Sequence, residues 1–182
     1  MRDIYISPIK AVLHCTDDPA LDFILCTSED YLSKPLPSNV LRLDFRDTVD
    51  VDDPAAFSAQ LAADVASFLQ RPDARPELFV CCDCGVSRSA ALAAAIRCAD
   101  GGSDFSIWDD PNYMPNPLVY RLTRRVLNAP ITEDALNDRL ALNATARRKA
   151  FSKKVTQTGA VEAKMPNGCR KISGKPNVTA TL

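Results

Sequence analysis

The chain has 182 residues and a mass of 19.9 kDa, which suits one domain with a core of ordinary size. Its 46% hydrophobic and 25% charged residues are typical of a soluble globular protein, and no apolar run is long enough to span a membrane. The net charge of −1 hides an asymmetry: residues 1–130 carry 12 basic and 19 acidic residues, and residues 131–182 carry 10 and 4. This split predicts a domain, 1–130, followed by a basic extension, 131–182.

Residues 1–130 alternate short apolar runs with segments of helical spacing. Predicted strands cover 4–6, 21–26, 40–43 and 78–81, and predicted helices cover 9–13, 54–70, 88–100 and 117–128. This alternation predicts an α/β fold with a layered, largely parallel central sheet flanked by helices.

Two dipeptides mark expected helix starts. Asp53-Pro54 and Asn116-Pro117 each place a good N-cap before a residue that suits the first helical position. The helices 54–70 and 117–128 are therefore expected to begin at these prolines.

The stretch from Val80 to Ser89 joins a predicted buried strand to an alanine-rich predicted helix. A turn of this kind directs several backbone N–H groups and the positive end of the helix dipole to one point, which suits an anion. Cys82 is expected at the end of the strand, and Arg88 on the first turn of the helix. That setting favours the thiolate form of Cys82. The planar fork of Arg88 suits two oxygens of a phosphate.

The stretch resembles the phosphate-binding loop of the cysteine-dependent protein tyrosine and dual-specificity phosphatases. In that family, His-Cys is followed by two residues, Gly, two residues, Arg, and Ser or Thr. Cys82, Gly85, Arg88 and Ser89 match this pattern in register, and Cys81 stands where the family has His. The absent His could leave the nucleophile less well activated.

Weaker similarity to small bacterial and phage-like members of the family extends over about residues 3–128. Phe45-Arg46-Asp47 fits an aromatic-x-Asp pattern after the third predicted strand, and residues 113–120 fit a Tyr-x-Pro-Asn-x-x-Val-Tyr pattern. No internal repeat is apparent.

The resemblance implies hydrolysis of phosphomonoesters through a cysteinyl-phosphate intermediate, with no metal and no cofactor. Cys82 would be the nucleophile, Ser89 would donate to its sulfur, and Arg88 would clamp the phosphate. The implied phosphate-binding N–H groups are those of Asp83, Cys84, Gly85, Val86, Ser87 and Arg88.

The leaving group needs a proton, which a carboxylic acid on a neighbouring loop would supply. Asp47 is the first choice because it fits the aromatic-x-Asp pattern. Asp44 is the second choice and Asp50 the third.

The expected substrate is a phosphorylated protein or a small phosphoester. Family members that act on phosphoinositides tend to carry basic residues at the variable loop positions, and residues 83–87 contain none. A phosphotyrosine-like or small phosphoester substrate is therefore favoured. The N-terminus lacks the apolar core of a signal peptide, and seven cysteines here do not form a secreted disulfide pattern, so a cytoplasmic location is expected.

Three other readings remain open. The chain could be an inactive relative that binds phosphoproteins through the same loop. Cys81, Cys82 and Cys84 could hold a metal, although they lack a second pair of ligands at the usual spacing, and the only histidine, His14, is far away in sequence. Cys81 or Cys84 could also form a reversible disulfide with Cys82 that protects it from oxidation.

The basic extension is expected to hold a polar helix over 131–155 and a disordered tail over 156–182. An acidic partner or a nucleic acid could bind the basic residues. The alternative is a solvated run of charge with no partner.

Overall fold

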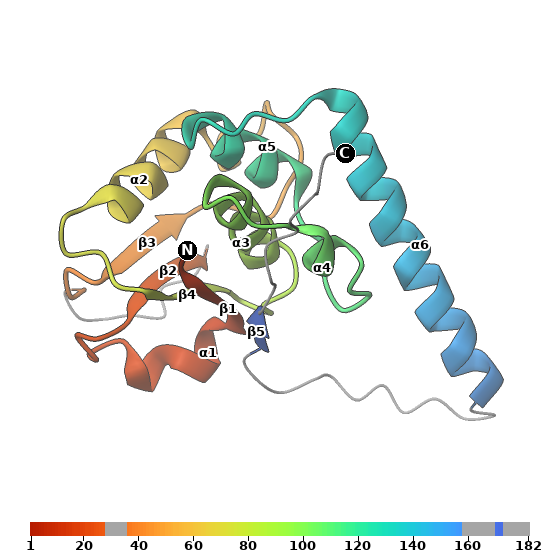
Figure 1. The fold of residues 1–182 in the computed structure, drawn as a ribbon, viewed down its shortest axis with the longest axis horizontal. Coiled ribbons are helices and arrows are strands. Elements are labelled where there is room, and N and C mark those ends of the chain that lie inside the picture. The colour runs from red at the N-terminus through yellow and green to blue at the C-terminus, as the bar shows by residue number, and fades with distance from the viewer. Residues whose placement is uncertain (28–35, 158–169, 173–182) are drawn as a thin grey trace, which may run out of the picture.

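The computed structural model describes residues 1–27, 36–157 and 170–172. Its sheet has the strand order β3-β2-β4-β1-β5. The strands are β1 (Asp3–Pro8), β2 (Asp22–Thr27), β3 (Val40–Asp44), β4 (Glu77–Cys82) and β5 (Arg170–Ile172). The first four pair in parallel, and β5 pairs antiparallel with β1 at one edge (Figure 1). This arrangement confirms the predicted α/β fold with a largely parallel sheet.

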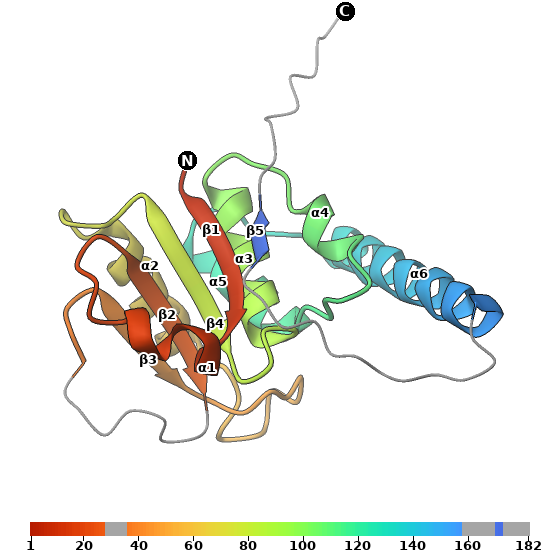
Figure 2. The ribbon, with the colours of Figure 1, turned by 90° about the horizontal axis from the view of Figure 1, so that it is seen from below.

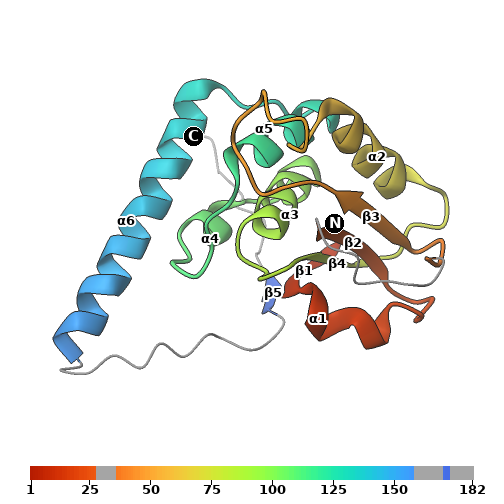
Figure 3. The ribbon, with the colours of Figure 1, turned by 180° about the vertical axis from the view of Figure 1, so that it is seen from behind.

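Helices cover both faces of the sheet, as Figure 2 shows. One face carries α1 (Ile9–Val12) and the short 3₁₀ helix η1 (Leu13–Cys15), and the other carries α2 (Ala59–Gln70), α3 (Arg88–Ala99) and α5 (Pro117–Val126). The short α4 (Phe105–Trp108) contacts α6 (Glu133–Gln157). The last turns of α6 stand away from the rest of the described molecule (Figures 1 and 3).

Burial on both faces follows from the sequence of β4 and α3. Side chains alternate along β4, so Val80 and Cys82 join the core beneath α3, and Cys81 joins the smaller core beneath α1. All of residues 90–96 in α3 are buried, because α3 lies between the sheet and α5. Five of these seven residues are alanine, which lets the neighbouring elements approach closely.

The predicted start of the helix 54–70 is wrong, because α2 begins at Ala59. Ser58 is its N-cap, and Ser58 Oγ accepts a hydrogen bond from the N–H three residues on. Asp53 instead caps a turn, since its Oδ1 accepts from the N–H of Ala55 at 2.9 Å. An ion pair between Asp53 and Arg46 (3.0 Å) fixes this turn in the loop before the helix.

The C-terminal extension departs from expectation in one place. The predicted helix over 131–155 is confirmed by α6, which continues to Gln157. The prediction of disorder is wrong for Arg170–Ile172, which form β5. Without β5 the edge strand β1 would expose a row of unpaired N–H and C=O groups, and such an edge readily accepts another strand. The rest of the predicted tail beyond α6, including Cys169, lies outside the described residues.

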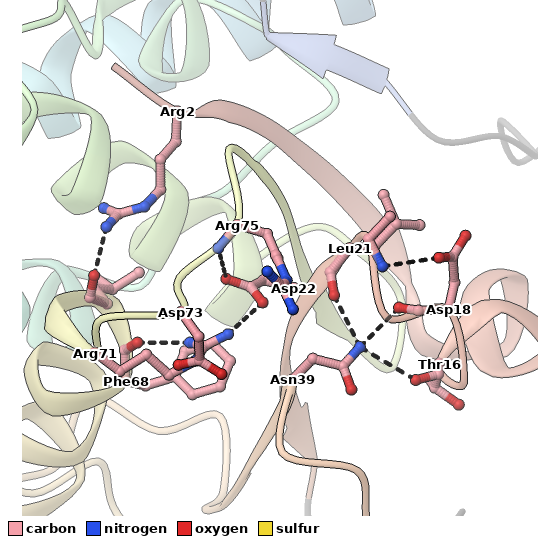
Figure 4. A network of polar contacts seen from close by, with 12 residues as sticks. Arg2, Thr16, Asp18, Leu21, Asp22, Asn39, Phe68, Arg71, Asp73 and Arg75 are labelled. Carbon is pink, nitrogen blue, oxygen red and sulfur yellow. Dashed lines mark hydrogen bonds and ion pairs between the residues drawn. The ribbon is translucent and has the colours of Figure 1, made fainter.

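A polar network closes the end of the sheet where β2 begins (Figure 4). Asp22 accepts a hydrogen bond from the N–H of Arg75 at 2.7 Å and pairs with the guanidinium of Arg71. Asn39 Nδ2 donates to the carbonyl oxygens of Asp18 (2.9 Å) and Leu21 (2.8 Å). These contacts join loops to one another, so we assign the network a role in the stability of the fold. It lies at the opposite end of the sheet from the carboxyl ends of the parallel strands.

A second buried network joins α4, α5 and α6. Asp104 is 1% exposed and accepts hydrogen bonds from Trp108 Nε1 (3.0 Å), the Tyr120 hydroxyl and Arg139 Nε (3.2 Å). Burial alone would raise the pKa of Asp104, but the hydrogen bonds from Arg139 and Tyr120 outweigh it and hold that pKa below its usual value. The carboxylate of Asp104 therefore stabilises the contact between α6 and the domain.

Replacing Asp104 by Asn is expected to lower the free energy of unfolding at pH 7 by about 2 kcal/mol, because Arg139 loses its buried counter-charge. The pKa of Asp104 is lower in the folded chain than in the unfolded chain, where it is about 3.9. Its contribution is therefore complete above about pH 4 and is lost as the pH falls through the folded value.

Urea unfolding of wild type and Asp104→Asn at neutral and acidic pH measures the contribution of Asp104 to the free energy of unfolding and its dependence on pH. The two stabilities should converge as the pH falls below the folded pKa of Asp104. Asp134→Asn, on the exposed first turn of α6, is the matched control and should unfold like wild type. Equal stability of wild type and Asp104→Asn at pH 7 would contradict the assignment.

Candidate functional site

The loop between β4 and α3, residues 82–88, lies at the carboxyl end of the parallel sheet. Ligands bind at this end in open α/β sheets. Gly85 has a φ of +69°, and a Cβ atom there would lie 2.8 Å from the Pro8 nitrogen and the Ser7 carbonyl carbon. Only glycine combines this backbone conformation with such close packing against the end of β1. The conformation of the 82–88 loop thus depends on β1, which lies near the N-terminus of the chain.

Cys82 ends β4 and lies beneath the first turn of α3. Its Sγ is 3.1 Å from Ser89 Oγ, and both residues are buried. The hydroxyl can donate to the sulfur, as the sequence analysis expects of Ser89. Because Ser89 is the second residue of α3, the sulfur lies near the positive end of a helix of twelve residues.

Arg88 is 5% exposed and is held at its two terminal nitrogens. Nη1 donates to the Phe45 carbonyl oxygen at 3.0 Å, and Nη2 pairs with the carboxylate of Asp83. Burial alone would lower the pKa of Arg88, but its hydrogen bond to Asp83 and the charges of Asp83 and Cys82 raise it. Arg88 therefore stays charged beside the thiol.

The Nε atom of Arg88 is buried and has no hydrogen-bond partner in the described part of the chain. A buried donor without a partner is costly. An anion in the 82–88 loop would satisfy it, together with the remaining hydrogen on Nη2.

The Asp83 side chain has a role that the sequence analysis missed, since only its N–H was expected to matter. Its carboxylate pairs with Arg88 and also accepts a hydrogen bond from Thr27 Oγ1 at 3.2 Å. Thr27 ends the neighbouring strand β2. Asp83 thus fixes the guanidinium, but it also places a negative charge beside the candidate anion site.

Of the three candidate acids, the structure brings Asp47 to the 82–88 loop. Asp47 Oδ1 accepts from Ser87 Oγ at 3.0 Å, although the two residues are 40 positions apart in the chain. Asp44 is exposed and pairs with Arg42 at 2.9 Å. Asp50 is exposed and accepts from a nearby backbone N–H in its own loop.

Asn116 is a positioning residue for Asp47 that the sequence analysis described only as a helix cap. Its Oδ1 accepts from the N–H of Leu118 (3.0 Å), which confirms the predicted cap of α5. Its Nδ2 donates to Asp47 Oδ1 (2.8 Å) and to the Thr48 carbonyl (3.0 Å). In the sequence, Asn116 belongs to the Tyr113-x-Pro-Asn116 pattern, which by itself does not indicate a contact with Asp47.

The loop before α5 also contacts the 82–88 loop directly. The N–H of Met114 donates to the carbonyl oxygen of Val86 at 3.0 Å. Segments after β3 and α4 therefore both contact the 82–88 loop.

Cys26, which is distant from Cys82 in sequence, lies beside it in the sheet. The register of β2 and β4 pairs Cys26 with Cys82, and both lie in the same core cluster. Cys81 points into the core on the other face, and Cys84 is exposed. Burial and the neighbouring charge of Cys82 raise the pKa of Cys26 well above its usual value, so Cys26 stays a neutral thiol.

The part of the chain that the structure describes offers neither a metal-binding cluster nor a membrane-spanning helix. No three His, Cys, Asp or Glu side chains there lie close enough to hold a metal ion. No described helix combines the length and the apolar character that a membrane crossing requires.

Comparison of the chain with protein-family models and with curated proteins gives no match. The function is therefore inferred from the residues of the site itself. That site combines a thiol at a helix N-terminus, a charged arginine with an unsatisfied buried donor, and a carboxylate on an adjoining loop. Such a group can bind an oxyanion, attack it through sulfur and exchange a proton with it.

Proposed function

We propose that this chain hydrolyses phosphomonoesters through a cysteinyl-phosphate intermediate, in the manner of protein tyrosine and dual-specificity phosphatases. The observation that carries the proposal is the hydrogen bond between Asp47 and Ser87, which joins the candidate acid to the loop of the candidate nucleophile. All six cysteines that the structure describes are free thiols, which supports a reducing, cytoplasmic setting.

In the first step, the sulfur of Cys82 attacks phosphorus and the bond from phosphorus to the leaving oxygen breaks. The loop N–H groups and Arg88 hold the three other phosphate oxygens. Asp47 gives a proton to the leaving oxygen. Both recorded hydrogen bonds of the Asp47 carboxyl go to Oδ1, so Oδ2 is the oxygen we assign to carry that proton.

In the second step, a water molecule attacks the phosphorus of the cysteinyl phosphate and the sulfur–phosphorus bond breaks. Asp47, now ionised, accepts a proton from this water. Ser89 donates a hydrogen bond to the departing sulfur, for which the contact of 3.1 Å is suitable. Inorganic phosphate then leaves, and the enzyme returns to its starting state.

The second candidate function is phosphoprotein binding without hydrolysis. It is favoured by Cys81, which stands in the place of a family histidine and points away from the site into the other core, so the nucleophile lacks that neighbour. The ion pair between Asp83 and Arg88 competes with phosphate for the guanidinium under either function.

The experiment that separates the two functions is a search for the covalent intermediate. The wild-type protein is mixed with p-nitrophenyl phosphate, quenched in acid during turnover, and digested for mass spectrometry. We expect release of nitrophenol and one phosphoryl group on the peptide that contains Cys82. Binding of phosphate or phosphopeptide without nitrophenol release or a modified peptide would establish the second function instead.

A further inference from the structure

An open groove of about 750 Å³ lies between the C-terminal half of α6 and the loop before α5. Pro111 contributes one wall. Ala144, Arg147, Arg148 and Phe151 contribute the other, and their spacing places them on one face of the helix. Asn143, one helical turn before Arg147, is buried and donates to the Trp108 carbonyl at 2.9 Å and to the Tyr113 carbonyl at 3.1 Å. The groove therefore begins next to the contact that holds α6 to the loop before α5.

The groove is connected to the 82–88 loop through two contacts. Arg147 Nη1 is 2.7 Å from Met114 Sδ, and the N–H of Met114 donates to the Val86 carbonyl at 3.0 Å. A ligand anchored at Cys82 can therefore extend over Met114 toward Arg147. The groove and the loop form parts of one surface.

The chemistry of the groove is basic and apolar. Within the described residues neither Arg147 nor Arg148 is paired with a carboxylate: Arg147 contacts only Met114, and Arg148 only Thr145 (3.5 Å). Two large apolar side chains near Arg147 are exposed: Phe151 to 70% and Met114 to 48%. Phe151 lies one helical turn after Arg147, and Met114 contacts it. Exposed apolar side chains that lie together often mark a binding surface. Two unpaired cations beside exposed apolar groups favour a ligand with both acidic and apolar side chains.

We propose that this groove binds the segment of a phosphorylated protein next to the phosphorylated residue and selects segments with acidic side chains. The inference rests on the proposed function, since it assigns the substrate of the same site. A protein segment fits better than a nucleic acid. The other side of the 82–88 loop carries the acidic stretch Asp44–Asp53, which would repel a continuous phosphate backbone but not a peptide with local charge.

The test measures binding of fluorescent peptides to the Cys82→Ser protein by anisotropy. One peptide carries phosphotyrosine flanked by acidic residues and a leucine, and its partner has the acids replaced by their amides. We expect the acidic peptide to bind about tenfold more tightly at low salt, and this preference to fall as salt is added. Arg147→Ala/Arg148→Ala should abolish the preference and leave the affinity for the amide peptide unchanged.

The matched control is Arg121→Ala/Arg125→Ala, which removes the same charge from α5, outside the groove. It should keep the preference. Persistence of the preference in Arg147→Ala/Arg148→Ala, its loss in the control, or tighter binding of a single-stranded oligonucleotide that depends on Arg147 and Arg148 would each overturn the inference. An unphosphorylated acidic peptide separates this result from the proposed function. If it binds as tightly as the phosphorylated one and still depends on both arginines, the groove is supported and the phosphate site is not.

Discussion

Replacing Cys82 by Ser is expected to reduce phosphomonoester hydrolysis by about 10⁴-fold or more, because the reaction loses its nucleophile. A serine hydroxyl stays protonated at neutral pH, and in the described structure the hydroxyl next to it is Ser89, which is no base. Binding of phosphate should persist, since the loop N–H groups and Arg88 are unchanged. Steady-state hydrolysis of p-nitrophenyl phosphate measures the loss of activity. Binding of a phosphopeptide measures the affinity that should be retained.

Cys15→Ser is the matched control, because Cys15 is a partly buried free thiol in η1, on the other face of the sheet. This variant should hydrolyse the substrate at the wild-type rate. Retention of activity in Cys82→Ser would refute the mechanism. Loss of phosphopeptide binding together with activity would show instead that the variant loop has not formed.

Replacing Asp47 by Asn should slow hydrolysis of phenyl phosphate by about 10²-fold or more, because the phenolate would leave without a proton. The loss should be much smaller with p-nitrophenyl phosphate, whose leaving group is stable as an anion. The amide keeps the size of the side chain and can still accept from Ser87 and Asn116.

The matched control for this variant is Asp44→Asn, which makes the same chemical change three residues earlier, at the end of β3. Asp44 pairs with Arg42 at the surface, so activity on both substrates should remain close to wild type. An equal loss on the two substrates in Asp47→Asn would argue against a role in protonating the leaving group. A larger loss in Asp44→Asn would transfer the role to that residue.

The features that the sequence predicted well are those encoded over short distances. Strand β4, the turn at Gly85 and the alanine-rich α3 are contiguous, so apolar runs and one glycine sufficed to predict a strand, a loop and a helix there. The cap at Asn116 was also local, because it depends on the next few residues. The start of α2 was predicted wrongly for the same reason. Asp53-Pro54 is a good local cap, but the loop is fixed by a contact with Arg46.

The features that the sequence did not predict depend on elements that meet only in the folded chain. The register between β2 and β4 places Cys26 beside Cys82, and no local pattern encodes that register. The second role of Asn116, which holds Asp47, joins residues 69 positions apart. The pairing of Asp83 with Arg88 depends on the shape of the 82–88 loop, which the sequence alone leaves undetermined.

The contact of Gly85 with Ser7 and Pro8 has a consequence for the order in which the molecule matures. A chain whose first strand has not yet docked carries an ordinary cysteine on a pliable turn. Its chemical reactivity would be acquired late, in the same cooperative event that completes the sheet. The thiol would thus reach its active surroundings only in chains whose sheet is complete.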